Sequence, residues 1–225
     1  MLDLHIAEKR HAPGQAVLRD IRLRAAPGQI AALLGRSGIG KTSLLRIVLG
    51  LDRDFDGHVT LSPGRVAAVF QEPRLLPWLT VLENLRLVLP PGTPAPDLEA
   101  LLEELGVPGV GPQRPATLSL GMARRVAIAR ALAVPPALLV LDEPFASLDR
   151  QRAEALGQVL RARAGQGALV LVAMHDAEHA LALADRVLVL DGAPATLVDD
   201  VSLRDAQARA VTRERLRGRY DFLGS

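Results

Sequence analysis

The sequence predicts an α/β fold, in which a sheet of buried strands is interrupted by a block of helices. Short apolar runs typical of strands buried on both faces alternate with segments of helical spacing before residue 71 and again after residue 135. Between these two stretches the chain is helical, with prolines separating the helices. We therefore expect a single domain built from a core (1–71 and 135–200), a helical insertion (72–134) and a helical C-terminal tail (201–225).

Composition limits what the chain can be. Its 225 residues are 49% hydrophobic and 23% charged, which is ordinary for a globular protein, and the net charge of +2 gives no reason to expect a nucleic-acid partner. There are no cysteines, so disulfides and cysteine metal sites are excluded. The longest uncharged apolar run, residues 131–141, contains two prolines and is shorter than the ~20 residues that span a bilayer. Any membrane-spanning part must come from another chain.

The N-terminal segment alternates apolar and polar residues, which predicts two half-buried strands at 2–7 and 17–24 and an antiparallel β subdomain. A buried strand at 29–34 follows, and then a helix from near Lys41 that stops at Gly50. Further strands are expected at 58–61, 65–70, 137–141, 167–173, 186–190 and 195–198. Of these, we expect the strands at 65–70, 137–141 and 167–173 to be buried. Further helices are expected at 81–89, 97–105, 120–134, 150–164 and 176–184, the first three capped by Thr80, Asp97 and Ser119.

The strand at 29–34 runs into a phosphate-binding pattern, G-x-x-x-x-G-K-[ST]. Its residues are Gly35, Arg36, Ser37, Gly38, Ile39, Gly40, Lys41 and Thr42, and Ser43 continues into the helix. Glycines let successive backbone N–H groups point at phosphate oxygens, and the helix directs its positive end at the same anion. Lys41 is expected to reach the terminal phosphates and Thr42 to bind Mg²⁺. Only two of the 27 basic residues are lysines, Lys9 and Lys41, which favours a specific role for Lys41 over an accidental match.

A second group of polar residues follows the apolar run 138–141, where Asp142 and Glu143 stand side by side. Ligands of open α/β sheets bind at the carboxyl ends of the strands. We expect Asp142 to hold Mg²⁺ and Glu143 to act as the general base that polarises a water molecule. The alternative is a solvated turn at the end of a strand, which the phosphate-binding pattern upstream makes less favourable.

Other polar residues also stand where predicted strands end. Gln71 follows the strand at 65–70, Ser147 and Asp149 follow the two carboxylates, and His175 follows the strand at 167–173. A lone histidine after a strand is more often a surface residue. Because several polar groups end neighbouring strands here, we expect Gln71 and His175 to belong to the catalytic site.

Taken together, these residues resemble an ATP-binding cassette, the nucleotide-binding subunit of an ABC transporter. The resemblance covers nearly the whole chain and lies in six motifs in family order. They are the Walker A loop (35–42), the Q-loop glutamine Gln71, the signature segment (118–122), the Walker B strand ending in Asp142 with Glu143, the D-loop (147–149) and the switch histidine His175. Residues 70–84 are similar to the ATPases of nitrate, sulfonate and taurine importers.

This resemblance implies a phosphate-loop NTPase (RecA-like) core and an Mg²⁺-dependent ATPase. Two copies are expected to pair head to tail around two ATP molecules, each lying between the Walker A loop of one chain and Ser119 and Gly121 of the other. Gln71 would be a further Mg²⁺ ligand. The helical insertion would dock on a separate permease, with Trp78 at the interface or packed under its own helix. The subunit would work peripherally at the cytoplasmic face of the inner membrane, served indirectly by a periplasmic or lipid-anchored solute-binding protein.

The chain departs from the family pattern in two places. The signature usually reads L-S-G-G-Q and here reads L-S-L-G-M. Leu120 lacks the backbone freedom of glycine and Met122 cannot donate a hydrogen bond, so we expect the isolated subunit to dimerise weakly. No Tyr, Phe or Trp precedes Phe55 to stack on adenine, and His11 is the nearest candidate.

Two other functions are open to a chain with a phosphate-binding loop: a cassette that acts on nucleic acid or ribosomes, and a small-molecule kinase. A cassette acting on nucleic acid or ribosomes usually has two cassettes or a long coiled coil, and this chain has neither; a small-molecule kinase would not need the signature segment or His175. The C-terminal tail is rich in arginine, at positions 204, 209, 213, 215, 217 and 219. We expect it to be a solvated helix face near anionic lipid rather than a nucleic-acid site.

Overall fold

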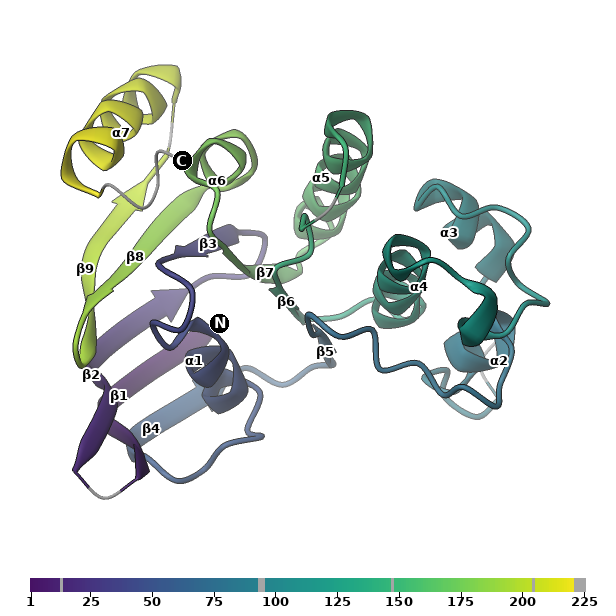
Figure 1. Ribbon diagram of the computed structural model, residues 1–225, viewed down its shortest axis with the longest axis horizontal. Helices are drawn as coiled ribbons and strands as arrows, with labels where there is room; N and C mark the ends of the chain where they lie inside the picture. Colours follow the sequence, from purple (N-terminus) through teal and green to yellow (C-terminus); the bar gives the residue numbers. More distant parts are fainter. Residues whose placement is uncertain (13, 93–95, 147, 204, 221–225) are drawn as a thin grey trace.

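A computed structural model describes residues 1–12, 14–92, 96–146, 148–203 and 205–220 (Figure 1). In these residues one nine-stranded sheet runs through the molecule. Its strands, in spatial order, are β4 (Asp56–Leu61), β1 (Leu2–Ala12), β2 (Gln15–Ala25), β9 (Ala195–Ser202), β8 (Arg186–Gly192), β3 (Ile30–Leu34), β7 (Leu169–Met174), β6 (Leu138–Asp142) and β5 (Val66–Val69). Strands β1, β2 and β4 pair antiparallel, whereas β3, β5, β6, β7 and β8 are parallel. The predicted α/β class is confirmed.

The described helices are α1 (Lys41–Val48), α2 (Val81–Arg86), α3 (Leu98–Glu104), the short 3₁₀ helix η1 (Pro115–Thr117), α4 (Leu120–Leu132), α5 (Arg150–Gly165), α6 (Ala177–Leu183) and α7 (Ala206–Arg219). The three predicted N-caps are confirmed, because the side chains of Thr80, Asp97 and Ser119 each accept a hydrogen bond from a backbone N–H in the first turn of their helix. At Thr80 the side chain of Glu83 bonds back to the cap, which completes a capping box.

Alternate residues of β3 face opposite sides of the sheet and belong to two separate cores. Ala31 and Leu33 pack with α1 and the antiparallel strands. Ile30, Ala32 and Leu34 pack on the other side with α5 and α6. All five residues of β3 are buried, as the unbroken apolar run predicts. The strand therefore carries the phosphate-binding loop at its end on a rigid, fully packed support.

Helices α2, α3 and α4 lie beside the core, at the end of the molecule opposite the antiparallel strands (Figure 1). The buried amide of Asn84 ties down the loop before α2: its Nδ2 donates to the Leu76 and Thr80 carbonyl oxygens and its Oδ1 accepts from Leu76 N–H. Trp78, in this loop, is 65% exposed. Of the two arrangements expected for Trp78, packing under its own helix is therefore wrong.

The lengths and burial of some strands differ from the sequence prediction. Strand β5 was expected to be buried, but it is the last strand of the sheet and has a neighbour on one side only, so Val66 is 45% exposed. Strand β4 begins at Asp56, two residues before the expected strand at 58–61, because it extends along β1. Strand β9 runs to Ser202 along β8, past residue 201 where the helical tail was expected to begin.

The C-terminal helix α7 is held to the core by the arginines that were expected to face solvent or lipid. Asp199 on β9 is 5% exposed and accepts from Arg215, Arg219 (3.4 Å) and the hydroxyl of Tyr220 (2.6 Å). Arg213 pairs with Glu178 on α6 at 3.0 Å. Arg204 lies outside the described residues. The side chains of Arg213, Arg215 and Arg219 are 43–53% exposed, as a solvated face predicts, but each also pairs with a carboxylate of the same chain, which the sequence did not predict.

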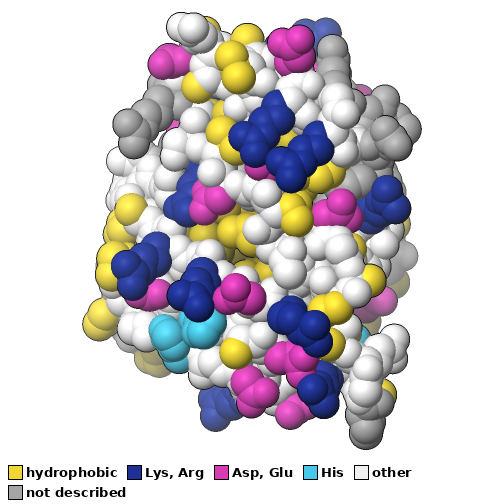
Figure 2. Space-filling view, turned by 90° about the vertical axis from the view of Figure 1, so that its left-hand side faces the viewer, with side chains coloured by type: hydrophobic (Ala, Val, Ile, Leu, Met, Phe, Trp, Pro, Cys, Tyr) yellow, Lys and Arg dark blue, Asp and Glu magenta, His cyan; other side chains and the backbone are white. Residues whose placement is uncertain are grey.

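The outer face of the antiparallel strands carries charges of both signs side by side (Figure 2). Cross-strand ion pairs account for this pattern, for example between Arg24 and Asp3 at 3.0 Å and between Arg186 and Asp200. Such exposed pairs contribute little stability but keep the face hydrated. None of the helices in the described ranges is long and apolar enough to cross a membrane.

Candidate active site

The phosphate-binding loop connects β3 to α1 and curls because of its glycines. Gly40 caps α1 with φ of +114°, which side chains rarely tolerate. A Cβ at Gly40 would also lie 2.8 Å from Leu18 Cδ2, so the close approach of β2 requires glycine here as well. The first turn of α1 contains no acidic residue, so its unpaired N–H groups are open to an anion.

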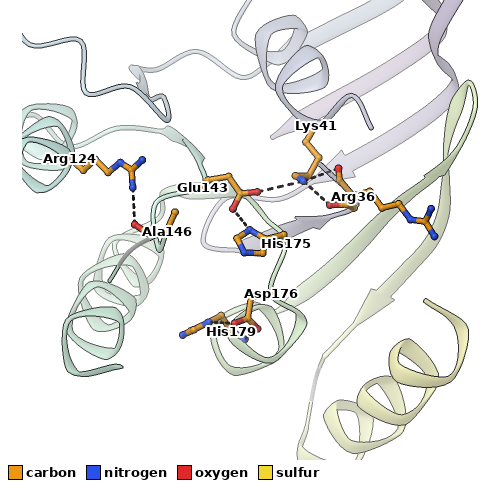
Figure 3. Close-up of polar contacts among 9 residues, drawn as sticks. Arg36, Lys41, Arg124, Glu143, Ala146, His175, Asp176 and His179 are labelled. Carbon is orange, nitrogen blue, oxygen red and sulfur yellow. Dashed lines mark hydrogen bonds and ion pairs between the residues drawn. The ribbon is translucent and has the colours of Figure 1, made fainter. Parts of the chain in front are cut away.

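Lys41, the first residue of α1, folds back over this loop. Its side chain is 7% exposed. The ammonium Nζ donates to the carbonyl oxygens of Gly35 at 2.7 Å and Arg36 at 3.2 Å, and lies 3.5 Å from Glu143 Oε1 (Figure 3). A buried cation held by two carbonyls and one carboxylate is a strong attraction for a phosphate.

Two of the three oxygen ligands predicted for Mg²⁺, Thr42 and Asp142, are already in contact. Thr42 Oγ1 donates to Asp142 Oδ2 at 2.7 Å. Burial raises the pKa of Asp142, as does the neighbouring Glu143, while the Thr42 hydrogen bond and Lys41 act in the opposite direction. One hydroxyl and one carboxylate, with room for phosphate oxygens and water, fit the oxygen coordination of Mg²⁺. The described residues contain no cluster of three or more His, Cys, Asp or Glu that would form an all-protein metal site.

Glu143 is held in place by several independent contacts. Its Oε2 lies 2.8 Å from His175 Nδ1 (Figure 3). Its backbone N–H donates to the Ala173 carbonyl oxygen at 3.0 Å. Its φ is +52°, a left-handed conformation that costs about 1–2 kcal/mol for a residue other than glycine. Strain of this kind persists where neighbouring contacts over-determine the backbone, and it gathers at functional sites.

These groups line one cavity of about 510 Å³ at the carboxyl ends of the parallel strands. The predicted residues on its wall are His11, Arg36, Ser37, Gly38, Gly40, Lys41, Thr42, Ser43, Gln71, Asp142, Glu143 and His175. Gly35 and Ile39 do not line it: Ile39 packs into the core beneath the loop. Sequence reasoning missed Gln15, Val17 and Ala146, which also line it. Gln15 is brought there because β2 starts two residues before the predicted strand, whereas Val17 is the first residue of that predicted strand.

His11 lies at the edge of this cavity, where an adenine ring was expected to stack. Its Nε2 is 3.3 Å from Ser43 Oγ in the first turn of α1. The imidazole is therefore tied to the helix that begins at the phosphate-binding loop. Stacking on a base stays a prediction.

The signature segment is not part of the cavity. Ser119 caps α4 by accepting from Met122 N–H at 3.3 Å, and Ser119, Leu120 and Gly121 do not line the cavity. Leu120 begins α4 and has no positive φ, so the expected backbone cost of replacing glycine is not found within the chain. Of the D-loop residues, Ser147 lies outside the described residues and Asp149 caps α5. A single chain thus holds one half of the predicted ATP site.

Comparison with known proteins decides the family. Residues 18–146 match the model of the ABC transporter family. The chain is a member of the ABC transporter ATP-binding family. It is 44% identical to an aliphatic sulfonates import ATP-binding protein of Burkholderia cenocepacia (93% of this chain, 80% of that protein) and 44% identical to one of Pseudomonas syringae pv. tomato (89% and 86%).

The fold of the ABC cassette agrees with solved structures. The dimeric ATP-binding cassette MJ0796, in a post-hydrolysis state with ADP and Pi, matches with a TM-score of 0.82 and 26% identity, covering 91% of this chain and all of that one. The predictions of an ATP-hydrolysing subunit of the ABC importer type, and of a phosphate-loop NTPase fold, are confirmed at the level of the family.

Proposed function

We propose that this ABC ATPase powers the uptake of aliphatic sulfonates through a separate permease at the cytoplasmic face of the inner membrane, supplied by a periplasmic or lipid-anchored binding protein. The observation that carries this proposal is the agreement between a cavity lined by Lys41, Asp142, Glu143 and His175 and the similarity, over nine-tenths of the chain, to sulfonate import subunits. The first supports the chemistry, and the second supports the transported class.

Within the cavity, each residue has a separate task in ATP hydrolysis. Lys41 exchanges its two carbonyl contacts for the terminal phosphates of ATP, and the loop N–H groups bind the same oxygens. Thr42 and Asp142, with Gln71, would hold Mg²⁺, which would neutralise phosphate charge. Glu143 takes the proton of the attacking water, and His175 fixes the carboxylate through Nδ1.

The second half of the site comes from a second copy. Ser119 and Gly121 of the partner subunit meet the ATP held by this chain, and pairing transmits the change to the permease. The docking face is the helical insertion, where Trp78 extends from a loop that Asn84 holds rigid. An exposed tryptophan on a fixed loop suits an interface anchor.

A chromosomal Glu143→Gln replacement tests the transported class. We expect the strain to lose growth on an alkanesulfonate as sole sulfur source and to grow normally on sulfate. The matched control is Glu154→Gln, an exposed carboxylate on α5 whose partner among the described residues is Arg150. Growth of the Glu143→Gln strain on every alkanesulfonate, taurine included, would refute sulfonate import. Loss of growth on nitrate as sole nitrogen source instead would reassign the solute, and loss of growth on taurine alone would narrow it to an amino-substituted sulfonate. Purification of the subunit with RNA rather than a permease would refute the importer role.

A further inference from the structure

The turn that carries the catalytic glutamate is also held from outside the cavity. Residues 143–146 form a turn after β6, closed by a hydrogen bond from Ala146 N–H to the Glu143 carbonyl oxygen at 3.3 Å. Arg124, on α4, donates from Nη1 to the Ala146 carbonyl oxygen at 2.9 Å (Figure 3). The guanidinium is therefore hydrogen-bonded to the last residue of a turn whose first residue is Glu143.

This contact bears on a strained backbone. The left-handed conformation of Glu143 needs restraint on both sides of the turn to persist. On the side of the cavity the restraints are the Ala173 carbonyl and His175. On the other side, Arg124 supplies a charged donor to a neutral carbonyl, which is stronger than an ordinary hydrogen bond.

Packing stability does not explain why position 124 is an arginine. Its Nε is the one buried side-chain polar atom without a hydrogen-bond partner in the part of the chain that the structure describes. Folded proteins bury few unpaired donors, and each one calls for a reason. An apolar side chain of similar length would fill this space without leaving a donor unpaired. The guanidinium is therefore better explained by what its Nη1 holds than by the stability of α4.

The helix that bears Arg124 begins at the signature segment. Ser119 caps α4 and Gly121 lies in its first turn, so Arg124 follows within about one further turn. We propose that Arg124 is a positioning residue that couples the N-terminus of α4, where the partner's ATP is bound, to the turn that orients Glu143 of the same chain. This inference rests on the proposed function, since it takes Glu143 as the general base.

Arg124 does not line the cavity, so it should affect turnover and not ATP binding. The test is Arg124→Met, which keeps the apolar stem and removes the donor. We expect kcat to fall about tenfold, equivalent to about 1.4 kcal/mol, with ATP affinity within twofold of wild type and the unfolding temperature not lowered. The matched control is Arg65→Met, which breaks the same kind of bond, from Nη1 to the Val88 carbonyl oxygen at 3.2 Å. Arg65 precedes β5 at the amino ends of the parallel strands, away from the carboxyl end of β6 where Glu143 lies, so this change should leave kcat unchanged.

The outcomes separate positioning from structure. Wild-type kcat in Arg124→Met would refute the inference, as would a parallel loss of kcat, ATP affinity and unfolding temperature, which marks a purely structural role. If the Met variant does not fold, Arg124→Gln is measured instead, because its shorter amide keeps the polarity of the side chain but does not reach Ala146. Wild-type kcat in this variant, or a parallel loss of kcat, ATP affinity and unfolding temperature, would again refute the inference. Absence of ATP hydrolysis by the wild-type chain would refute the proposed function and this inference with it, whereas an active wild type and an equally active variant refute the inference alone.

Discussion

Replacing Gly121 with alanine should make the isolated chain more stable and less active. Gly121 lies in the first turn of α4 without a positive φ, and a Cβ built there meets no atom within 4 Å. Nothing in the chain itself therefore requires glycine. Alanine in a helix is favoured over glycine by about 0.5–1 kcal/mol, which raises the unfolding temperature by about 1–4 °C for a chain of this size. The same methyl group would stand between the α4 N–H groups and a phosphate on the partner chain.

Two measurements on one protein preparation decide this prediction. Thermal unfolding without nucleotide should show the gain in stability, and steady-state ATP turnover at saturating Mg²⁺ should fall about tenfold or more, as expected for loss of transition-state donors. Gly165→Ala is the control, because Gly165 ends α5 with equally open surroundings and no positive φ. It should gain similar stability and keep full turnover. Undiminished hydrolysis by Gly121→Ala would show that no phosphate approaches this glycine closely.

Three further predictions concern single side chains. Glu143→Gln should bind ATP normally but turn over about 10²–10⁴-fold more slowly, because an amide cannot accept the proton; turnover within a few-fold of wild type would exclude Glu143 as the base. Lys41→Ala should weaken ATP binding by about 10–100-fold in a direct binding assay, and Lys41→Arg should not restore it, since a guanidinium is too wide for this loop; tight binding by the Arg variant would contradict that reason. Tyr220 is the only tyrosine, and its burial together with its hydrogen bond to Asp199 raises its pKa to about 12. The protonated hydroxyl therefore contributes to the stability of the folded chain below pH ~10, the ordinary pKa of tyrosine, and this stabilisation is lost as the pH rises through about 12. A tyrosinate absorbance titration of the native chain should therefore show that midpoint, and a midpoint near 10 would mean that α7 is not docked.

Local pattern accounts for what the sequence predicted well. The unbroken apolar run of β3 needs burial on both faces, and its glycine-rich end permits the positive φ that the loop adopts at Gly38 and Gly40. Ser, Thr and Asp caps bond within three residues of themselves, so Thr80, Asp97 and Ser119 could be assigned without knowing the tertiary structure. The cavity residues that follow strands could be assigned because parallel strands end at one edge.

What the sequence did not predict depends on partners far apart along the chain. The prediction that β5 is buried was wrong because an apolar strand at the edge of a sheet has the same sequence pattern as one in the middle. The ion pairs of the tail arginines were not predicted because their partners, Glu178 and Asp199, belong to earlier elements, and no local spacing relates them. Glu143 has a left-handed backbone that a sequence pattern would assign to glycine or asparagine, and only the turn and its contacts account for it.

The exposed start of α4 is best understood as a surface made for a second copy. Gly121 has lower helix propensity than alanine and fills no tight space, and Leu120 is 57% exposed. Neither choice stabilises the chain on its own. Burying the exposed part of Leu120 between two copies would contribute about 1–1.5 kcal/mol to pairing, taken as roughly half of the value for a whole leucine side chain. Leu120 has no positive φ, so replacing glycine at this position costs the backbone nothing, and burial of its side chain favours association. The expectation of weak dimerisation therefore rests on Met122, whose side chain packs against the core and offers no hydrogen-bond donor.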